Sequence, residues 1–260
     1  MNVRLLVDGD IIAYRTAAAC EHPIKWDEDL WTLHTSEAEV MAELTKAIEA
    51  LKDKFKTEEV IIALSDRKNF RKELNPEYKA NRANTRKPMG LGVAQDFFKT
   101  KYLAVIWPTL EADDVLGIMA TQSFDEDTII VSDDKDLQTI AGYHYNKGEV
   151  IEVSEQQALK NFYTQVLTGD TADNYKGCRG VGPVKAERIL AGCKTSLDMW
   201  QAVLGAYAKA EQPSEDALMN ARMAYLLRAG DVNISFGNVK LWTPPLTADE
   251  GYTKEMANGS

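Results

Sequence analysis

The sequence has few cysteines, few histidines and no long apolar run, and each absence excludes a class of protein. Cys20, Cys178 and Cys193 are an odd number without the spacing of a zinc site, so we expect free thiols in a reducing compartment. No stretch resembles a signal peptide or is apolar enough to span a bilayer, which predicts a cytoplasmic protein without membrane contact. The three histidines are expected to be surface or core residues, so the chemistry must come from other groups.

The chain also has no excess of basic residues. Its 40 acidic residues outnumber its 30 lysines and arginines and give a net charge of −10. An acidic chain is a poor candidate for binding nucleic acid. That objection weakens if a metal site holds many acids, since subtracting nine candidate ligands from the 40 leaves 31 against 30 bases. With 260 residues, 45% of them apolar, the chain can form one large or two modest globular domains.

The densest acidic motif is Glu111-Ala-Asp113-Asp114, which follows an apolar stretch closed by Pro108. Three carboxylates in four residues repel one another and raise each other's pKa. They stay ionised together when a divalent cation lies between them. The same acids would also suit the first turn of a solvated helix, where they complement the helix dipole. The motif alone therefore leaves a metal site and an acidic helix cap as open alternatives.

Acidic residues recur where buried strands are predicted to end. The strands are expected at 3–7, 60–64, 103–107 and 128–131, and the acids that follow them are Asp8, Asp66, the Glu111 motif, and Asp134 with Asp136. Asp8 taken alone could equally cap the helix that follows it. Four repeats of one pattern favour a shared site, because parallel strands present their carboxyl ends at a single edge of the sheet.

One window, residues 67–92 (the basic segment), reverses the acidic character of the chain. Its cations include Arg71, Lys72, Lys79 and Arg82, and Tyr78 lies among them. A charge run is usually a solvated face. This one follows a strand-ending acid and carries aromatics, which favours a segment that grips phosphates. Tyr78 either stacks on an end base of a nucleic acid or packs in the core.

The second half of the chain is predicted to be helical. A hairpin is expected at 143–153, and a helix cap follows at Ser154. This half contains Gly169-Asp170-Thr-Ala-Asp173 and the glycine-rich run Gly177-Cys-Arg-Gly180-Val-Gly182, followed by Pro183 and Lys185. Backbone amides at a helix start, with cations nearby, form a phosphate cradle, although a glycine-rich turn can also be purely structural. The tail from 244 to 260 is polar and expected to be loose.

In their order along residues 1–243, these motifs together resemble the flap endonuclease and 5′→3′ exonuclease superfamily. Within it they are most similar to the exonucleases of short-tailed bacteriophages. The resemblance implies an α/β, PIN-like core at 1–153 with a largely parallel central sheet, in which the basic segment forms an arch or gateway. It also implies a helical DNA-binding region at 154–243, with a helix-hairpin-helix-like motif near 169–190.

The resemblance further implies a metal-dependent nuclease that releases nucleotides from 5′ ends of duplex DNA. Members of the superfamily also cut flaps, and some remove RNA from RNA·DNA hybrids. A potassium ion often lies at the helix hairpin in this superfamily. The sequence does not give the oligomeric state, and we expect a monomer.

Individual residues carry the resemblance. The superfamily's metal-binding acids correspond to Asp8, Asp66, Glu111, Asp113, Asp114, Asp134, Asp136, Asp170 and Asp173. Its basic gateway residues correspond to Lys79 and Arg82, which would be catalytic, and the expected DNA contacts are Arg71, Lys72, Tyr78, Gly180, Gly182 and Lys185. Asp10 departs from the pattern, since many relatives have a neutral residue there, and is left out of the ligand set. Asp133 lies beside its motif.

All nine candidate ligands are carboxylates, without histidine or cysteine, and such hard oxygen donors select Mg²⁺ or Mn²⁺ over zinc. The expected mechanism is hydrolysis of a phosphodiester by two ions about 4 Å apart. Two other readings stay open. Asp8-Gly-Asp10 with Asp133-Asp134 also resembles the acids of a haloacid-dehalogenase-like phosphatase, which would require Asp10 for activity. The third is a PIN-like domain that binds nucleic acid without catalysis.

Overall fold

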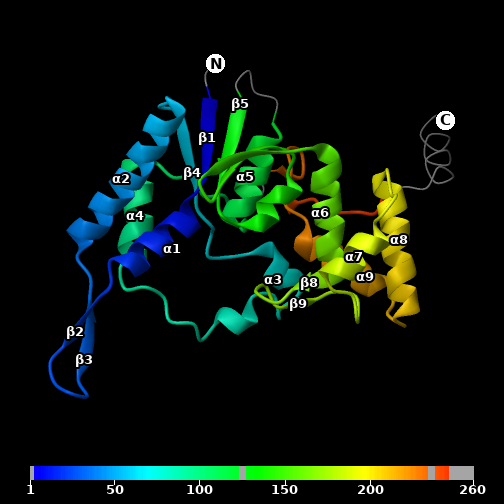
Figure 1. Ribbon diagram of the computed structural model, residues 1–260, viewed down its shortest axis with the longest axis horizontal. Coiled ribbons are helices and arrows are strands. Elements are labelled where there is room, and N and C mark those ends of the chain that lie inside the picture. Colours follow the sequence, from blue (N-terminus) through cyan, green and yellow to red (C-terminus); the bar gives the residue numbers. More distant parts are fainter. Residues whose placement is uncertain (1–2, 123–126, 234–237, 246–260) are drawn as a thin grey trace. The chain divides into compact units, whose positions relative to one another are not determined.

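The computed structural model describes residues 3–122, 127–233 and 238–245, and these fold into two compact units (Figure 1). Unit 1 comprises Met1–Phe70, Asn84–Val153 and Leu226–Val239, and unit 2 comprises Arg71–Ala83, Ser154–Tyr225 and Lys240–Ser260. A junction between the units coincides with the expected boundary at 153/154. Two segments depart from the expected domains, because 71–83 belongs to unit 2 and 226–239 to unit 1. Most of the expected loose tail, 246–260, lies outside the described residues.

Unit 1 is built on a five-stranded sheet in the order β4-β1-β5-β6-β7. The strands are β1 (Val3–Asp8), β4 (Val60–Ala63), β5 (Asp127–Val131), β6 (Gly142–Asn146) and β7 (Glu149–Val153). The strands β4, β1, β5 and β6 are parallel, and β7 pairs antiparallel with β6. The predictions of a largely parallel sheet and of a hairpin near 143–153 are confirmed.

The strand order brings the acidic strand ends together. Because β1 lies between β4 and β5, its carboxyl end is flanked by theirs. In register, Asp8 lies opposite Ala63 of β4, and Val7 lies opposite Val131 of β5. The residues directly after these three strands therefore share one edge of the sheet, which we call the acidic edge.

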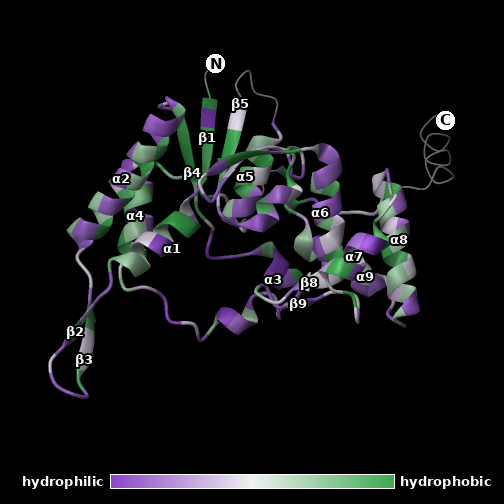
Figure 2. Ribbon diagram, viewed as in Figure 1, coloured by the Kyte–Doolittle hydropathy of each residue, from purple (hydrophilic) through white to green (hydrophobic). Residues whose placement is uncertain are grey.

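Helices cover both faces of this sheet. On one face α1 (Gly9–Ala19), α2 (Glu37–Phe55) and α4 (Leu91–Lys101) pack against one another, over a core that includes Leu5 and Val7. Leu6 points to the opposite face, because side chains alternate along a strand. There α5 (Ala112–Ala120) packs on β1, β4 and β5. The central strands are mostly apolar in Figure 2, as burial on both faces requires.

The longest helix shows why these elements form. Ser36 caps α2, with its side chain accepting a hydrogen bond from the Glu39 amide. Val40, Leu44 and Ile48 then recur at helical spacing and are fully buried. The helix predicted from Ser36 to Phe55 is therefore confirmed.

Glycine is required where α1 begins. A Cβ atom on Gly9 would lie 2.6 Å from Ile62 Cγ2 and 2.7 Å from the Ala63 carbonyl oxygen. The absence of a side chain lets the start of α1 pack directly on β4. This close approach fixes the turn that carries Asp8.

Two segments of unit 1 differ from the prediction. Residues 103–107 make a single bridge, between Val105 and Ala63, rather than a strand. The predicted strand is wrong because Leu103 has a left-handed backbone (φ 51°) and Pro108 lacks an amide to continue a ladder. The other difference is a hairpin of β2 (His22–Lys25) and β3 (Trp31–His34), whose residues are all exposed.

Unit 2 is mainly helical. Its helices are α6 (Glu155–Thr168), α7 (Pro183–Ile189), α8 (Ser196–Lys209) and α9 (Ser214–Ala224), and its core includes Tyr163, Val166, Val203 and Tyr207. The strands β8 (Gly169–Asp170) and β9 (Tyr175–Lys176) form a short antiparallel pair. The basic segment contributes α3 (Phe70–Leu74), of which Phe70 lies in unit 1, and a 3-10 helix at Ala80–Arg82. A last short pair, β10 (Val232–Asn233) and β11 (Asn238–Val239), belongs to unit 1.

None of the helices in the described part of the chain is both long enough and apolar enough to cross a lipid bilayer.

A buried histidine makes the stability of unit 1 depend on pH. His144 in β6 is buried, its Nε2 lies 2.9 Å from the Ile140 carbonyl oxygen, and burial lowers its pKa below 6.5. The unfolded chain therefore binds a proton at a higher pH than the folded chain does. The resulting stability should be complete above about pH 6.5, the unfolded pKa, and should be lost as pH falls through the lower folded pKa. Urea midpoints at several pH values measure the loss.

The matched control for this pH dependence is His144→Gln, which keeps a side-chain donor but cannot titrate. We expect its urea midpoint to fall less than that of the native chain over the same pH range. Parallel curves for the two proteins would contradict a role for His144.

Candidate active site

Asp8 lies at the centre of the acidic edge and is only 2% exposed. Its Oδ1 accepts a hydrogen bond from the Ile11 amide (3.1 Å), and its Oδ2 accepts one from Ser132 Oγ (2.8 Å). Burial raises the pKa of Asp8 to about 6, repulsion by Asp10 and Asp134 adds to the rise, and the two hydrogen bonds oppose it. Asp8 therefore caps α1 and also faces other carboxylates.

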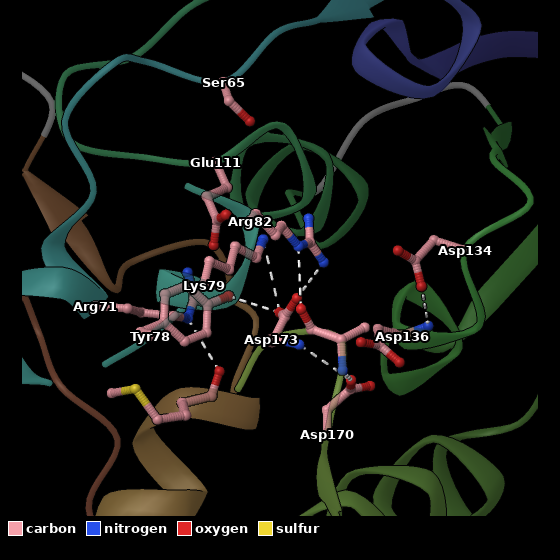
Figure 3. Close-up of polar contacts among 12 residues, drawn as sticks. Ser65, Arg71, Tyr78, Lys79, Arg82, Glu111, Asp134, Asp136, Asp170 and Asp173 are labelled. Carbon is pink, nitrogen blue, oxygen red and sulfur yellow. Dashed lines mark hydrogen bonds and ion pairs between the residues drawn. The ribbon is translucent and has the colours of Figure 1, made fainter. Parts of the chain in front are cut away.

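Ser132 joins the ends of β1 and β5. Its Oγ donates to Asp8 and accepts a hydrogen bond from the Asp134 amide at 3.0 Å. Asp134 Oδ1 in turn accepts the Asp136 amide at 2.8 Å, which begins the 3-10 helix at Lys135–Thr139 (Figure 3). Sequence reasoning missed Ser132, although a hydroxyl directly after a buried strand, two residues before an expected ligand, was a usable signal.

The end of β4 is fastened to the start of α5. Asp66 Oδ2 accepts the Thr109 amide at 2.9 Å, and this bond lowers the pKa of Asp66. Ser65 Oγ accepts the Ala112 amide at 2.9 Å. These bonds hold the Glu111 motif beside the end of β4.

Within the Glu111 motif, Asp114 is fully buried, and its carboxylate accepts hydrogen bonds from two backbone amides. Its Oδ2 accepts the Glu111 amide at 3.3 Å, and its Oδ1 accepts the Leu227 amide at 3.2 Å. Glu111 and Asp113 are partly exposed. The helix-cap alternative thus describes Asp114 and the N-cap residue Glu111, while Glu111 and Asp113 stay partly exposed.

The donor chemistry of the acidic edge fits Mg²⁺ or Mn²⁺, because its groups are hard carboxylate oxygens and Asp8 already experiences repulsion that a cation would relieve. Among the described residues, no three His, Cys, Asp or Glu side chains are already gathered closely enough to enclose an ion. The residues that would hold an ion here are Asp8, Asp66, Glu111, Asp113, Asp134 and Asp136.

Replacing Ser132 with alanine should weaken the binding of divalent ions roughly 10–100-fold, because the hydroxyl orients both Asp8 and the Asp134 backbone. Calorimetric titration with Mn²⁺ measures the change. The matched variant Ser154→Ala removes a helix cap in unit 2 and should leave ion binding unchanged. Equal affinity in the Ser132 variant and the native chain would contradict this role.

The remaining two candidate ligands lie in unit 2, on the turn between β8 and β9 (residues 170–174, the acidic turn). Asp170 Oδ1 accepts the Ala172 amide at 2.6 Å and the Asp173 amide at 3.2 Å. Asp173 contacts both predicted catalytic cations, Arg82 at 2.5 Å and Lys79 at 3.6 Å (Figure 3). The structure therefore brings Lys79, Arg82 and Asp173 together within unit 2.

Two of the predicted DNA contacts are wrong. Arg71 is 1% exposed, and its guanidinium donates to the carbonyl oxygens of Met223 (3.0 Å) and Tyr225 (2.7 Å). Tyr78 is also buried, stacks on Tyr175 and donates to Asp173 Oδ2 at 2.8 Å. Both side chains hold unit 2 together, so the packing alternative for Tyr78 applies. Lys72 is exposed, as a phosphate contact requires.

The glycine-rich turn precedes α7 as predicted. Gly180 has a left-handed backbone (φ 71°), Gly182 caps α7, and Pro183 is its first residue. A hollow of about 400 Å³ adjoins the turn, and its lining includes the cations Arg179, Lys185 and Lys209. This part of unit 2 is a concave basic surface.

A largely parallel sheet with carboxylates at its carboxyl edge, joined in one chain to a basic segment and a glycine-rich helical turn, defines a metal-dependent nuclease. A family profile described as the 5′-3′ exonuclease, N-terminal resolvase-like domain, matches residues 3–168. The chain belongs to this 5′-3′ exonuclease family. The predicted family, α/β fold and metal-dependent 5′-3′ exonuclease and flap-cleaving class are thereby confirmed.

Individual relatives resemble the chain over most of its length. An exonuclease of Escherichia phage T7 is 27% identical over 279 aligned positions, which cover 92% of this chain and 93% of the relative. The flap endonuclease Xni of a Shewanella strain is 27% identical, covering 87% and 89%. A flap endonuclease of phage T5, solved with DNA and metal ions, has a TM-score of 0.64 at 17% identity, covering 87% and 89%.

Family membership overturns the phosphatase reading and the non-catalytic reading. The surroundings of Asp10 agree with its exclusion from the ligand set. Its Oδ2 accepts the Ser65 amide at 3.0 Å, and its Oδ1 accepts Gln95 Nε2 at 3.4 Å. Asp133 Oδ2 pairs with Arg15 and its Oδ1 accepts the Lys147 amide, so its oxygens are engaged outside the hydrogen bonds that run through Ser132.

Proposed function

We propose that the chain hydrolyses phosphodiester bonds at the 5′ ends of duplex DNA, using Mg²⁺ or Mn²⁺ held at the acidic edge. The observation that carries the proposal is the hydrogen-bonded link from Asp8 through Ser132 to Asp134 across two strand ends. A phage T5 relative of similar fold was crystallised with DNA and metal ions, which supports DNA as the substrate.

The finer features of the function follow the sequence resemblance. We propose two divalent ions, removal of RNA from RNA·DNA hybrids, and a potassium ion at the glycine-rich turn. A monomer acting in the cytoplasm is the expected form.

Bound divalent ions would lower the pKa of water and stabilise charge on the oxygens of the scissile phosphate. The chain's own part is to hold those ions and to orient the carboxylates. Ser132 fixes Asp8, the end of β5 fixes Asp134 and Asp136, and Asp66 is fixed by the Thr109 amide. Not every acid need touch an ion, since Asp114 can act by holding the start of α5.

Lys79 and Arg82 are proposed to stabilise negative charge that develops on the scissile phosphate. A guanidinium offers a planar fork of donors and an ammonium offers a compact charge, so the pair suits a phosphoryl group. Lys72, Gly180, Gly182 and Lys185 are the proposed contacts to the DNA backbone. Such contacts position the duplex without reading its sequence.

The experiment that tests the proposed function is cleavage of duplex DNA labelled at its 5′ end, with Mg²⁺ or with EDTA. We expect short 5′ products with Mg²⁺ and none with EDTA. A duplex labelled at the 3′ end is the matched control, and its label should stay in long fragments. Binding without turnover, or release of phosphate from small monoesters with the duplex intact, would overturn the proposal.

A further inference from the structure

The basic segment is fastened to the acidic turn inside unit 2. The Lys79 amide donates to the Asp173 carbonyl oxygen at 2.8 Å, and Asn81 Nδ2 donates to the Thr171 carbonyl oxygen at 3.0 Å. Asn174 closes the other side by donating to the Glu77 carbonyl oxygen at 2.7 Å. Backbone and amide bonds therefore join these two segments, and the ionised side chains around Asp173 add to the contact.

The carboxylate of Asp173 is the electrostatic centre of this contact (Figure 3). Its Oδ1 accepts Arg82 Nη2 at 2.5 Å, and its Oδ2 accepts the Tyr78 hydroxyl at 2.8 Å with Lys79 Nζ at 3.6 Å. The Asp173 side chain is 15% exposed, so these charges are screened less than surface pairs are. Arg82 Nε also donates to the Ala172 carbonyl oxygen at 3.0 Å.

Both carboxylate oxygens of Asp173 therefore already contact groups of the same chain. Oδ1 contacts Arg82, and Oδ2 contacts Lys79 and the Tyr78 hydroxyl. An ion that took Asp173 as a ligand would share these oxygens with Arg82 and Lys79 and would lie beside two positive charges. Two cations face this carboxylate, and the Arg82 side chain is 52% exposed. The guanidinium can therefore be held on one side by Asp173 and still present donors to a phosphate.

We propose that Asp173 is a positioning residue, which orients Lys79 and Arg82 for the scissile phosphate, rather than a direct metal ligand. Asp170 helps to hold Asp173 in place, because its carboxylate accepts hydrogen bonds from the Ala172 and Asp173 amides and so fixes the turn. The inference rests on the proposed function for what the cations do, but the contact itself stands on the geometry of unit 2 alone.

A double-mutant cycle tests the coupling between Asp173 and Arg82. We expect Asp173→Asn and Arg82→Ala each to slow single-turnover cleavage roughly 10²-fold, with duplex affinity unchanged or tighter for the Asp173 variant. The double variant should be about as slow as the slower single one, because both changes remove the same interaction. If the rate losses of the two single variants multiplied in the double variant, the proposal would be overturned.

Two readouts do not depend on activity. Mn²⁺ titration of Asp173→Asn without DNA should give the same number of ions at the same affinity as the native chain, whereas loss of an ion would restore Asp173 as a ligand. Hydrogen exchange at the Lys79 amide should become about tenfold faster in that variant. The matched variant Asp216→Asn, an exposed acid in α9, should change neither. If the native chain does not cleave DNA, the proposed function fails, and unchanged exchange would separately refute the part of the Asp173 carboxylate in this contact.

Discussion

Replacing Asp134 with asparagine is expected to slow DNA cleavage by roughly 10²–10³-fold or more, while duplex binding stays the same or tightens. The asparagine carbonyl can still accept the Asp136 amide, so the 3-10 helix keeps its cap and only the charge is lost. An ion at the acidic edge loses a ligand, and a phosphate loses a repulsive neighbour. Single-turnover rates and duplex affinities, both at one fixed salt concentration, measure the two effects.

The adjacent variant Asp133→Asn is the matched control for Asp134, because the Asp133 oxygens pair with Arg15 and the Lys147 amide rather than joining the link through Ser132. It should change the cleavage rate little. Parallel loss of cleavage and binding in the Asp134 variant would count against its assignment as a ligand, since that pattern indicates damage to the fold or to the DNA surface.

Replacing Arg71 with alanine should destabilise the protein by about 3–5 kcal/mol, which is large against the total stability of a domain. The guanidinium is buried and donates to two backbone carbonyl oxygens, those of Met223 and Tyr225. Its removal leaves a buried and a partly buried acceptor without that donor and opens a cavity between α3 and the end of α9. Denaturant unfolding measures the loss.

The neighbouring variant Lys72→Ala gives the opposite pattern. Lys72 is exposed, so its loss should change stability by less than about 0.5 kcal/mol and weaken duplex binding in a salt-dependent way. If Arg71→Ala kept full stability and lost DNA binding, Arg71 would face the substrate after all.

The features of the fold that the sequence predicted are those set by local patterns. Buried strands of β-branched residues followed by acids placed β1, β4 and β5, and a capped apolar stripe placed α2. The hairpin of β2 and β3 was missed because its residues are exposed on both faces, so neither strand is a buried apolar run. At 103–107 the apolar run suggested a strand, but a left-handed residue and a proline limit it to one bridge.

The candidate site was likewise predictable only where local sequence patterns determine it. The acidic edge was predictable because parallel strands bring their ends together whatever the loops between them do. The errors at Arg71 and Tyr78 arose because their partners, Met223, Tyr225 and Asp173, lie far away in the sequence. Charge within a window cannot reveal a partner about 150 residues away, so a structural arginine and a phosphate-binding arginine look the same in sequence.

The most direct test of the central claim is anomalous diffraction from crystals of the native chain soaked in Mn²⁺. We predict ordered ions bound by Asp8, Asp134 and other carboxylates of the acidic edge. Ordered ions only on other carboxylates, with Asp8 and Asp134 unbound in a protein that still cleaves DNA with Mn²⁺, would contradict the account.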